Sequence, residues 1–402
     1  MEKKEEEFLI MAISKSKKKL IDELKRVMIE TKPKISENFM KSNPYYIRVI
    51  SKNELGKSVI DHKDITEEEF VNSFKNKREG VKYDFRKQIF LNGDNEKTSD
   101  KNIAKSCFDL YKQGSGNEFK WRHYKENMYP PKMAAIHSSS MLCFNAFFRV
   151  NKDNPITIKG VEYDKVVFEA KLHTLKTSNA CANMDAVLIS TGGETILFIE
   201  SKFTETFETH SRKQIMEGNN PKLSRQYLHS EKYFNVLGEK NVLGEKWVRF
   251  INDIKEDETV LPITGSHFDL KQDLCHCIGI YNFVNRSYIS NEKFAESEKW
   301  KFINKKGNLS KLDLTKISKY NFMNLEYEPD EGEYRELHDC YNSAKQYGLE
   351  FGKKVKPNIF NKDAFNKDIS FNYYFYSYKE FANECLPEGK HKELFMKKYL
   401  LK

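Results

Sequence analysis

The stretch that decides the fold runs from residue 184 to residue 203: Met184-Asp-Ala-Val-Leu-Ile-Ser-Thr-Gly-Gly-Glu-Thr-Ile-Leu-Phe-Ile-Glu-Ser-Lys-Phe203. Two apolar runs, 186–189 and 195–199, flank the two glycines at 192 and 193. This pattern predicts a tight β-hairpin, because both turn positions can take positive φ. With the glycines as the loop, Thr191 faces Glu194, and the same register places Asp185 directly opposite Glu200.

The alternation of side chains along a strand decides which residues share a face. Paired residues lie on one face, so Asp185 and Glu200 should lie together, with Lys202 two residues further along. A loop of two or four residues keeps this pairing, whereas an odd-length loop would separate the acids. Both faces are apolar, which predicts the covered centre of a sheet with helices packed on it. The acids' face holds Val187, Ile189, Ile196 and Phe198, and the other face holds Ala186, Leu188, Leu197 and Ile199.

Two facing carboxylates need a partner that offsets their repulsion. At roughly 5 Å they repel by about 3 kcal/mol at an effective dielectric near 20. Lys202 can offset part of this, and a divalent cation bridging Asp185 and Glu200 can offset more. Hard oxygen ligands favour Mg²⁺ over Zn²⁺. In the alternative interpretation, Asp185 and Lys202 are surface charges at strand ends and Glu200 is only their ion-pair partner.

The motif of an aspartate, a hairpin and then Glu200-Ser201-Lys202 resembles the PD-(D/E)xK phosphodiesterase superfamily, which includes many restriction endonucleases and repair nucleases. The signature's proline is replaced by Met184, and the resemblance covers residues 184 to 203 only. It implies that Asp185, Glu200 and the carbonyl of Ser201 hold one or two Mg²⁺ ions, for which Mn²⁺ can substitute. It also implies that Lys202 positions or deprotonates the attacking water.

The resemblance also implies a fold. We expect an α/β protein whose restriction-endonuclease-like core has a central mixed β-sheet flanked by helices, with a largely helical amino-terminal region and a mixed carboxy-terminal extension. The segment 134–148 should form the helix before the first core strand. Many such helices carry an acid that completes the metal site, and this one has none. Glu169, in the expected strand 166–175, is the substitute third carboxylate. Its alternative role is an exposed strand glutamate paired with Lys171.

A helix after the motif is the second expected contributor to the site. Residues 268–280 carry Leu270, Leu274 and Ile278 at helical spacing. In this superfamily a glutamine on such a helix often points at the site, which makes Gln272 the candidate, and His276 lies one turn away. Gln226, on an expected amphipathic helix at 222–234, competes for the same role.

The remainder of the chain sets the context for this core. We expect a mainly helical region over 1–128, the catalytic core over 129–300 and a mixed extension over 301–402. Residues 8–30 have the spacing of a packed helix. The basic and aromatic run 119–125 could contact DNA or pack on the core. The aromatic run 371–381 is interpreted as a strand followed by a helix, with packing favoured over base stacking.

Composition limits the partners and the compartment. The net charge of +9, from 68 basic and 59 acidic residues, suits a phosphate backbone but supports a nucleic-acid partner only weakly. Seven scattered cysteines give no disulfide framework. The first residues are charged, and the longest apolar stretch is too short to span a bilayer. We therefore expect a cytoplasmic protein with no membrane contact.

The function expected from these features is a Mg²⁺-dependent endodeoxyribonuclease, most simply a type II-like restriction endonuclease acting on double-stranded DNA. Cutting both strands with a single-site chain would suggest a homodimer. A phosphate-loop motif for ATP-driven movement is missing from the sequence. The alternatives are a repair, recombination or mobile-element nuclease acting on branched or damaged DNA, and a non-catalytic DNA-binding protein that retains the fold.

Overall fold

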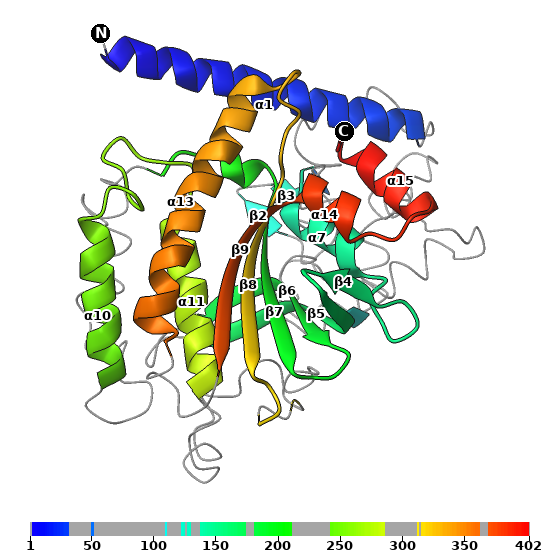
Figure 1. The fold of residues 1–402 in the computed structure, drawn as a ribbon. Coiled ribbons are helices and arrows are strands. Elements are labelled where there is room, and N and C mark those ends of the chain that lie inside the picture. Colours follow the sequence, from blue (N-terminus) through cyan, green and yellow to red (C-terminus); the bar gives the residue numbers. More distant parts are fainter. Residues whose placement is uncertain are drawn as a thin grey trace.

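The computed structural model of the 402-residue chain describes residues 2–31, 50–51, 109–110, 122–124, 127–129, 137–173, 181–210, 242–285, 312, 315–361 and 369–401. Its centre is a curled, mixed sheet of six strands in the order β4-β5-β6-β7-β8-β9 (Figure 1). The first four strands are antiparallel to one another, and β8 and β9 run parallel to β7. The strands are β4 (Ile156–Ile158), β5 (Val161–His173), β6 (Cys181–Ser190), β7 (Thr195–Lys202), β8 (Lys319–Glu326) and β9 (Ser370–Ser377).

Helices cover both faces of this sheet (Figure 1). One face packs against α11 and α13, with α10 packed on the outside of α13, and the other packs against α7 and α14. We call these the α11 face and the α7 face. The helix α15 packs on α14, and the long first helix α1 lies across the end of the sheet against α13 and α15 (Figure 1). The helices are α1 (Glu2–Thr31), α7 (Ser139–Phe147), α10 (Val242–Lys255), α11 (Leu270–Asn285), α13 (Arg335–Ile359), α14 (Tyr378–Glu384) and α15 (Lys390–Lys398), and a short 3₁₀ helix, η4 (Thr204–Phe207), follows β7.

This arrangement confirms the expected α/β class with a mixed sheet between helices. The helices expected at 8–30, 134–148 and 268–280 are present as α1, α7 and α11, and the aromatic run 371–381 forms nearly all of β9 and the start of α14. The division into three regions stays a prediction, and the sheet takes β8 and β9 from beyond residue 300. A second, small sheet has the order β1-β3-β2, from Ile50–Ser51, Asn127–Tyr129 and Arg122–Tyr124.

The hairpin of β6 and β7 has the predicted register. Ala186 pairs with Ile199 and Ile189 pairs with Ile196, so continuation of the register places Asp185 across from Glu200. The turn differs in detail. Gly193 N donates to Ser190 O at 2.8 Å, and of the two glycines only Gly193, at φ +75°, takes positive φ. The pairing is unchanged because the number of residues between the paired strands is still even.

The predicted faces of the hairpin are confirmed by the two apolar cores. Val187, Ile189, Ile196 and Phe198 belong to the core on the α11 face. Ala186, Leu188, Leu197 and Ile199 belong to the core on the α7 face. The centre of the sheet is therefore buried on both sides, as two apolar strand faces require.

The regular alternation of side chains between the two faces of the sheet is interrupted at one row of residues across β5 and β6. Phe168 and Ala186 pack on the α7 face, but Ala170 and Met184, two residues further along each strand, pack on the α11 face. Residues two apart normally share a face, so both strands change sides between these pairs. The residue inside this break on β5 is Glu169, whose φ is +53°. Asp185 occupies the matching position on β6, which places both acids where the sheet bends.

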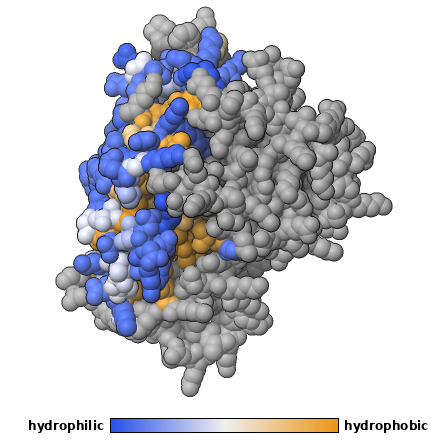
Figure 2. Space-filling model, turned by 90° about the vertical axis from the view of Figure 1, so that its right-hand side faces the viewer, coloured by the Kyte–Doolittle hydropathy of each residue, from blue (hydrophilic) through white to orange (hydrophobic). Residues whose placement is uncertain are grey.

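The outer surface agrees with a core buried between layers. On the face drawn in Figure 2, the described residues are mostly hydrophilic, and hydrophobic side chains show between them. Within the described part of the chain, every helix is too short or too polar to cross a membrane.

Candidate active site

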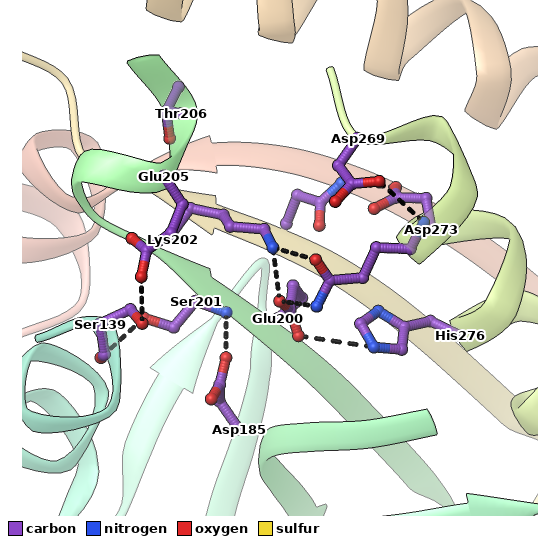
Figure 3. A network of polar contacts seen from close by, with 12 residues as sticks. Ser139, Asp185, Glu200, Ser201, Lys202, Glu205, Thr206, Asp269, Asp273 and His276 are labelled. Carbon is purple, nitrogen blue, oxygen red and sulfur yellow. Dashed lines mark hydrogen bonds and ion pairs between the residues drawn. The ribbon is translucent and has the colours of Figure 1, made fainter. Parts of the chain in front are cut away.

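Asp185 lies where β6 and β7 separate. The pairing between these strands ends at Ala186 and Ile199. The Ser201 amide therefore lacks a backbone partner on β6. The Asp185 carboxylate takes that place, because its Oδ2 accepts a hydrogen bond from Ser201 N at 2.7 Å (Figure 3). The side chain is therefore held against the backbone of β7, next to Glu200.

Glu200 and Lys202 form a buried ion pair at the end of β7. Lys202 Nζ lies 2.9 Å from Glu200 Oε1, and the two side chains are only 12% and 5% exposed. Both point toward α11 (Figure 3). The acid and the amine are two residues apart on one strand, so the alternation along β7 brings them together, as the sequence predicted.

Two residues of α11 reach the same carboxylate. Gln272 Nε2 donates to Glu200 Oε1 at 2.6 Å, and its Oε1 accepts a short hydrogen bond from Lys202 Nζ. Gln272 thus bridges the ion pair. His276, one turn later, has its Nε2 3.5 Å from Glu200 Oε2 and is buried. Gln272 thus contacts the two motif residues that it was expected to approach, and His276 lies beside it. Their part in a reaction stays a prediction.

Glu169 is buried rather than exposed, so its alternative role as a surface glutamate is wrong. It sits on β5 between Phe168 and Ala170, which pair with Ala186 and Met184, and so lies in the same row as Asp185. A non-glycine residue at positive φ is strained, and such strain is kept where the surrounding structure fixes it. Three carboxylates on three neighbouring strands, Glu169, Asp185 and Glu200, therefore share one row of the sheet.

The charges in this row act on one another. Burial raises the pKa of Asp185 well above its ordinary value, and the neighbouring carboxylates of Glu200 and Glu169 raise it further. Burial by itself would lower the pKa of Lys202, but Glu200 and Asp269 raise it above its ordinary value. Lys202 is therefore a cation at neutral pH. Burial lowers the pKa of His276, which keeps that imidazole neutral.

Ser201 points to the opposite side of β7. Its Oγ donates to Ser139 O at 3.1 Å and lies 2.7 Å from Tyr378 Oη, and the tyrosine must then be the donor of that second bond. These contacts tie the end of β7 to α7 and α14. They were not predicted, because nothing in the sequence indicates which hydroxyls meet across separate helices.

Oxygen atoms on β6 and at the end of β7 could serve as metal ligands. Among the residues that the structure describes, no group of three or more His, Cys, Asp or Glu side chains is arranged to hold one ion together. Asp185, Glu200 and the Ser201 carbonyl make a smaller set of hard oxygen donors. Such a set suits Mg²⁺, which usually keeps several waters and takes one or two carboxylates. The mutual repulsion of the acids is also what a bound cation would relieve.

The remaining candidates fall outside the described residues. These are Gln226 with its expected helix at 222–234, and the side chains of the basic and aromatic run 119–125. Sequence reasoning missed Asp269 and Glu326, which lie near Lys202. The charge of Asp269 raises the pKa of Lys202, and the charge of Lys202 partly opposes the rise in the pKa of Glu326. The only signal for Glu326 was a charged residue directly at the end of an apolar strand.

Comparison with known proteins gives one match. Residues 61–253 match the family model described as "Restriction Endonuclease associating with ARP". The matched segment covers slightly less than half of the chain and contains β5, β6 and β7 with Glu169, Asp185, Glu200 and Lys202. It supports a restriction-endonuclease-like family. Neither the curated proteins nor the solved structures gave a match.

Proposed function

We propose that this chain is a Mg²⁺-dependent endonuclease of the PD-(D/E)xK type, most simply a type II-like restriction endonuclease that hydrolyses phosphodiester bonds of double-stranded DNA. The observation that carries the proposal is the buried ion pair of Lys202 and Glu200 at 2.9 Å, with Asp185 across the hairpin from that glutamate. The match to a restriction-endonuclease-like family model supports the same reaction class.

Each acid has a distinct part in the proposed site. Asp185 and Glu200, with the carbonyl of Ser201, would hold Mg²⁺, for which Mn²⁺ can substitute. When bound, the ion supplies a Lewis acid for the scissile phosphate and makes water a stronger nucleophile. Glu169, buried in the same row, is the third acid and keeps the local charge negative. A surplus of negative charge that is costly without a cation favours cation binding.

Lys202 supplies positive charge next to the reacting phosphate. Its ammonium is held by Glu200 and Gln272 on the α11 face of the sheet. A fixed cation in a buried site stabilises the negative charge that develops on a phosphate during hydrolysis, and does so without reorganisation at the moment of reaction. Of the two roles that the motif allows this lysine, its environment favours charge stabilisation over removal of a proton from water. Gln272 forms hydrogen bonds with both the ammonium of Lys202 and the carboxylate of Glu200 and holds the two groups in place.

The first test is cleavage of DNA by the purified chain in Mg²⁺ and in chelator, on plain plasmid and on branched DNA. We expect cleavage in Mg²⁺ only, at discrete positions of the plasmid. Selective cutting of branched DNA would favour a repair or recombination nuclease instead, and binding without hydrolysis in both Mg²⁺ and Mn²⁺ would overturn the proposal. Sedimentation of the active species tests the homodimer that double-strand cutting suggests.

A matched pair of lysine variants tests the chemistry. Lys202→Ala should lower the cleavage rate by about a hundredfold to a thousandfold, the usual effect of removing one charge-stabilising group. Lys165→Ala removes an exposed lysine from the neighbouring part of β5 and should leave the rate unchanged. Equal rates for the two variants would remove Lys202 from the mechanism. Thermal melting of both shows whether either loss is one of folding.

A further inference from the structure

A closed ring of buried hydrogen bonds lies behind the candidate active site, between α11, β8 and β9. Asp273 Oδ2 accepts a hydrogen bond from Tyr373 Oη at 2.5 Å and another from Asn324 Nδ2 at 2.6 Å. Asn324 Nδ2 also donates to Tyr373 Oη at 2.7 Å, which closes the ring. Asp273 is 2% exposed and Asn324 is fully buried. The proposed reaction uses none of these three residues.

The ring sits next to the residues that contact Glu200. Asp273, labelled in Figure 3, directly follows Gln272 on α11. Asn324 is the β8 residue that pairs with Glu200 of β7. The hydrogen bond between Asp273 and Asn324 therefore joins α11, which carries Gln272, to β8, the strand beside Glu200. Burial disfavours the charged form of Asp273 and raises its pKa well above the ordinary value, and the hydrogen bonds from Tyr373 and Asn324 only partly oppose this. A buried polar group of this kind specifies one geometry of the elements that it connects.

Tyr373 is itself fixed from behind by α13. A Cβ atom at Gly352 would lie 2.3 Å from Tyr373 Cδ1. One at Gly348 would lie 2.6 Å from Phe375 Cδ2 and 3.3 Å from Tyr373 Oη. No side chain fits at either glycine, so the backbone of α13 packs directly against the side chains of β9. The helix thereby holds the aromatic ring of Tyr373 in place. The phenol hydroxyl is thereby placed against Asp273 and Asn324.

The other end of α11 is fixed by apolar contact. A Cβ atom at Gly279 would lie 2.8 Å from Leu172 Cβ and 3.3 Å from Ala182 Cβ, so this turn of the helix rests directly on β5 and β6. With Gly279 seated there and Asp273 tied to β8 and β9, the helix is fixed at two points. Gln272 lies at the end that the polar ring controls.

We propose that Asp273, Asn324 and Tyr373 are positioning residues, which act through Gln272 to hold Glu200 and Lys202 in their reactive arrangement. This inference rests on the proposed function, since it assigns the ring to the same site. Among the described residues, the ring makes no hydrogen bond to Glu200 or Lys202. It fixes the rotation of α11, and with it the reach of the Gln272 amide to Glu200 at 2.6 Å.

The first experiment reads the position of Gln272 without any reaction. In a ¹⁵N-labelled full chain, the side-chain amide resonances of Gln272 are assigned by their loss in Gln272→Ala. Tyr373→Phe removes one hydroxyl from the hydrogen-bonded ring of Asp273, Asn324 and Tyr373. The change should move the amide resonances of Gln272 toward those of a solvent-exposed glutamine. Tyr374→Phe removes a hydroxyl from the next residue of β9, on the α7 face, and should leave them in place. Unchanged resonances in Tyr373→Phe would overturn the proposal.

The second experiment is a double-mutant cycle on the cleavage rate. Tyr373→Phe should lower kcat about tenfold with little change in KM, as changes to residues that support a site typically do. In the Gln272→Ala background the same change should have less than about a twofold effect, because residues that act through one another are not additive. A full tenfold loss in both backgrounds would show that the ring does not act through Gln272.

The two experiments separate the inference from the function on which it rests. If the wild-type chain cleaves no DNA, the proposed nuclease activity fails, while the amide resonances still decide whether the ring positions Gln272. If Tyr373→Phe does not fold, Asp273→Ala is measured in the same way. It removes the oxygen that accepts the hydrogen bonds of Tyr373 and Asn324, so the same shift is expected.

Discussion

Glu326 offers a test of the electrostatics around the site that does not depend on activity. It ends β8 directly beside Lys202 of β7, is 4% exposed, and accepts a hydrogen bond from Thr206 Oγ1 at 2.7 Å. Burial raises the pKa of Glu326 from 4.5 to about 7, although Thr206 and Lys202 lower it in part. The folded protein therefore binds a proton at Glu326 more tightly than the unfolded chain does.

The sign of the effect on stability follows from that difference. Because the folded state binds more protons, the free energy of unfolding falls as pH rises between about 4.5 and 7. Above that window the ionised carboxylate costs about 3 kcal/mol, and below it the cost is absent. Glu326→Gln cannot ionise and keeps an oxygen that can accept from Thr206. The variant should therefore match the wild type near pH 4.5 and exceed its stability by about 3 kcal/mol at pH 8.

The assay is urea unfolding of both proteins at several pH values between 4.5 and 8, with the difference in free energy plotted against pH. Glu331→Gln, which changes an exposed carboxylate shortly after the strand, is the matched control for the loss of a carboxylate. A constant difference between Glu326→Gln and the wild type would refute the reasoning. So would a loss of stability that grows as pH rises.

Two further predictions concern packing and capping. Gly352→Ala should destabilise the fold by about 1–3 kcal/mol in urea unfolding, because its Cβ would meet Tyr373 Cδ1 at 2.3 Å, whereas Gly332→Ala, whose nearest contact is at 3.4 Å, should be nearly neutral. Ser377→Ala should cost about 1 kcal/mol and lower the melting temperature, because Ser377 and Glu380 form the capping box at the start of α14. An unchanged melting temperature would contradict a stabilising role of this cap.

The hairpin and its register could be predicted because the information is local. The apolar runs and the glycines set the pairing of Ala186 with Ile199, and the alternation of β7 brought Glu200 and Lys202 to one face. The conformation of the turn did not affect this result. Which residues share a face depends only on whether the loop has an even or an odd number of residues. The α11 helix could be predicted for the same reason, from the spacing of its leucines, and Gln272 with it.

The rest of the site depends on contacts between segments that are far apart in the sequence. The change of sides at Glu169 and Asp185 requires a positive φ at a glutamate, a conformation that sequence alone gives no reason to expect. The ring of Asp273, Asn324 and Tyr373 joins three elements whose neighbourhood is set by the parallel strands β8 and β9. Only the order of strands in the sheet brings such residues together.

The central claim is that the acid on β6 and the ion pair on β7 form one reactive centre. It is tested most directly by the single-turnover rate of DNA cleavage in Mg²⁺ for Asp185→Asn and for Glu194→Gln, an exposed carboxylate at the turn of the same hairpin. We predict that Asp185→Asn is folded and inactive, while Glu194→Gln cleaves at the wild-type rate. Wild-type cleavage by Asp185→Asn would contradict the claim.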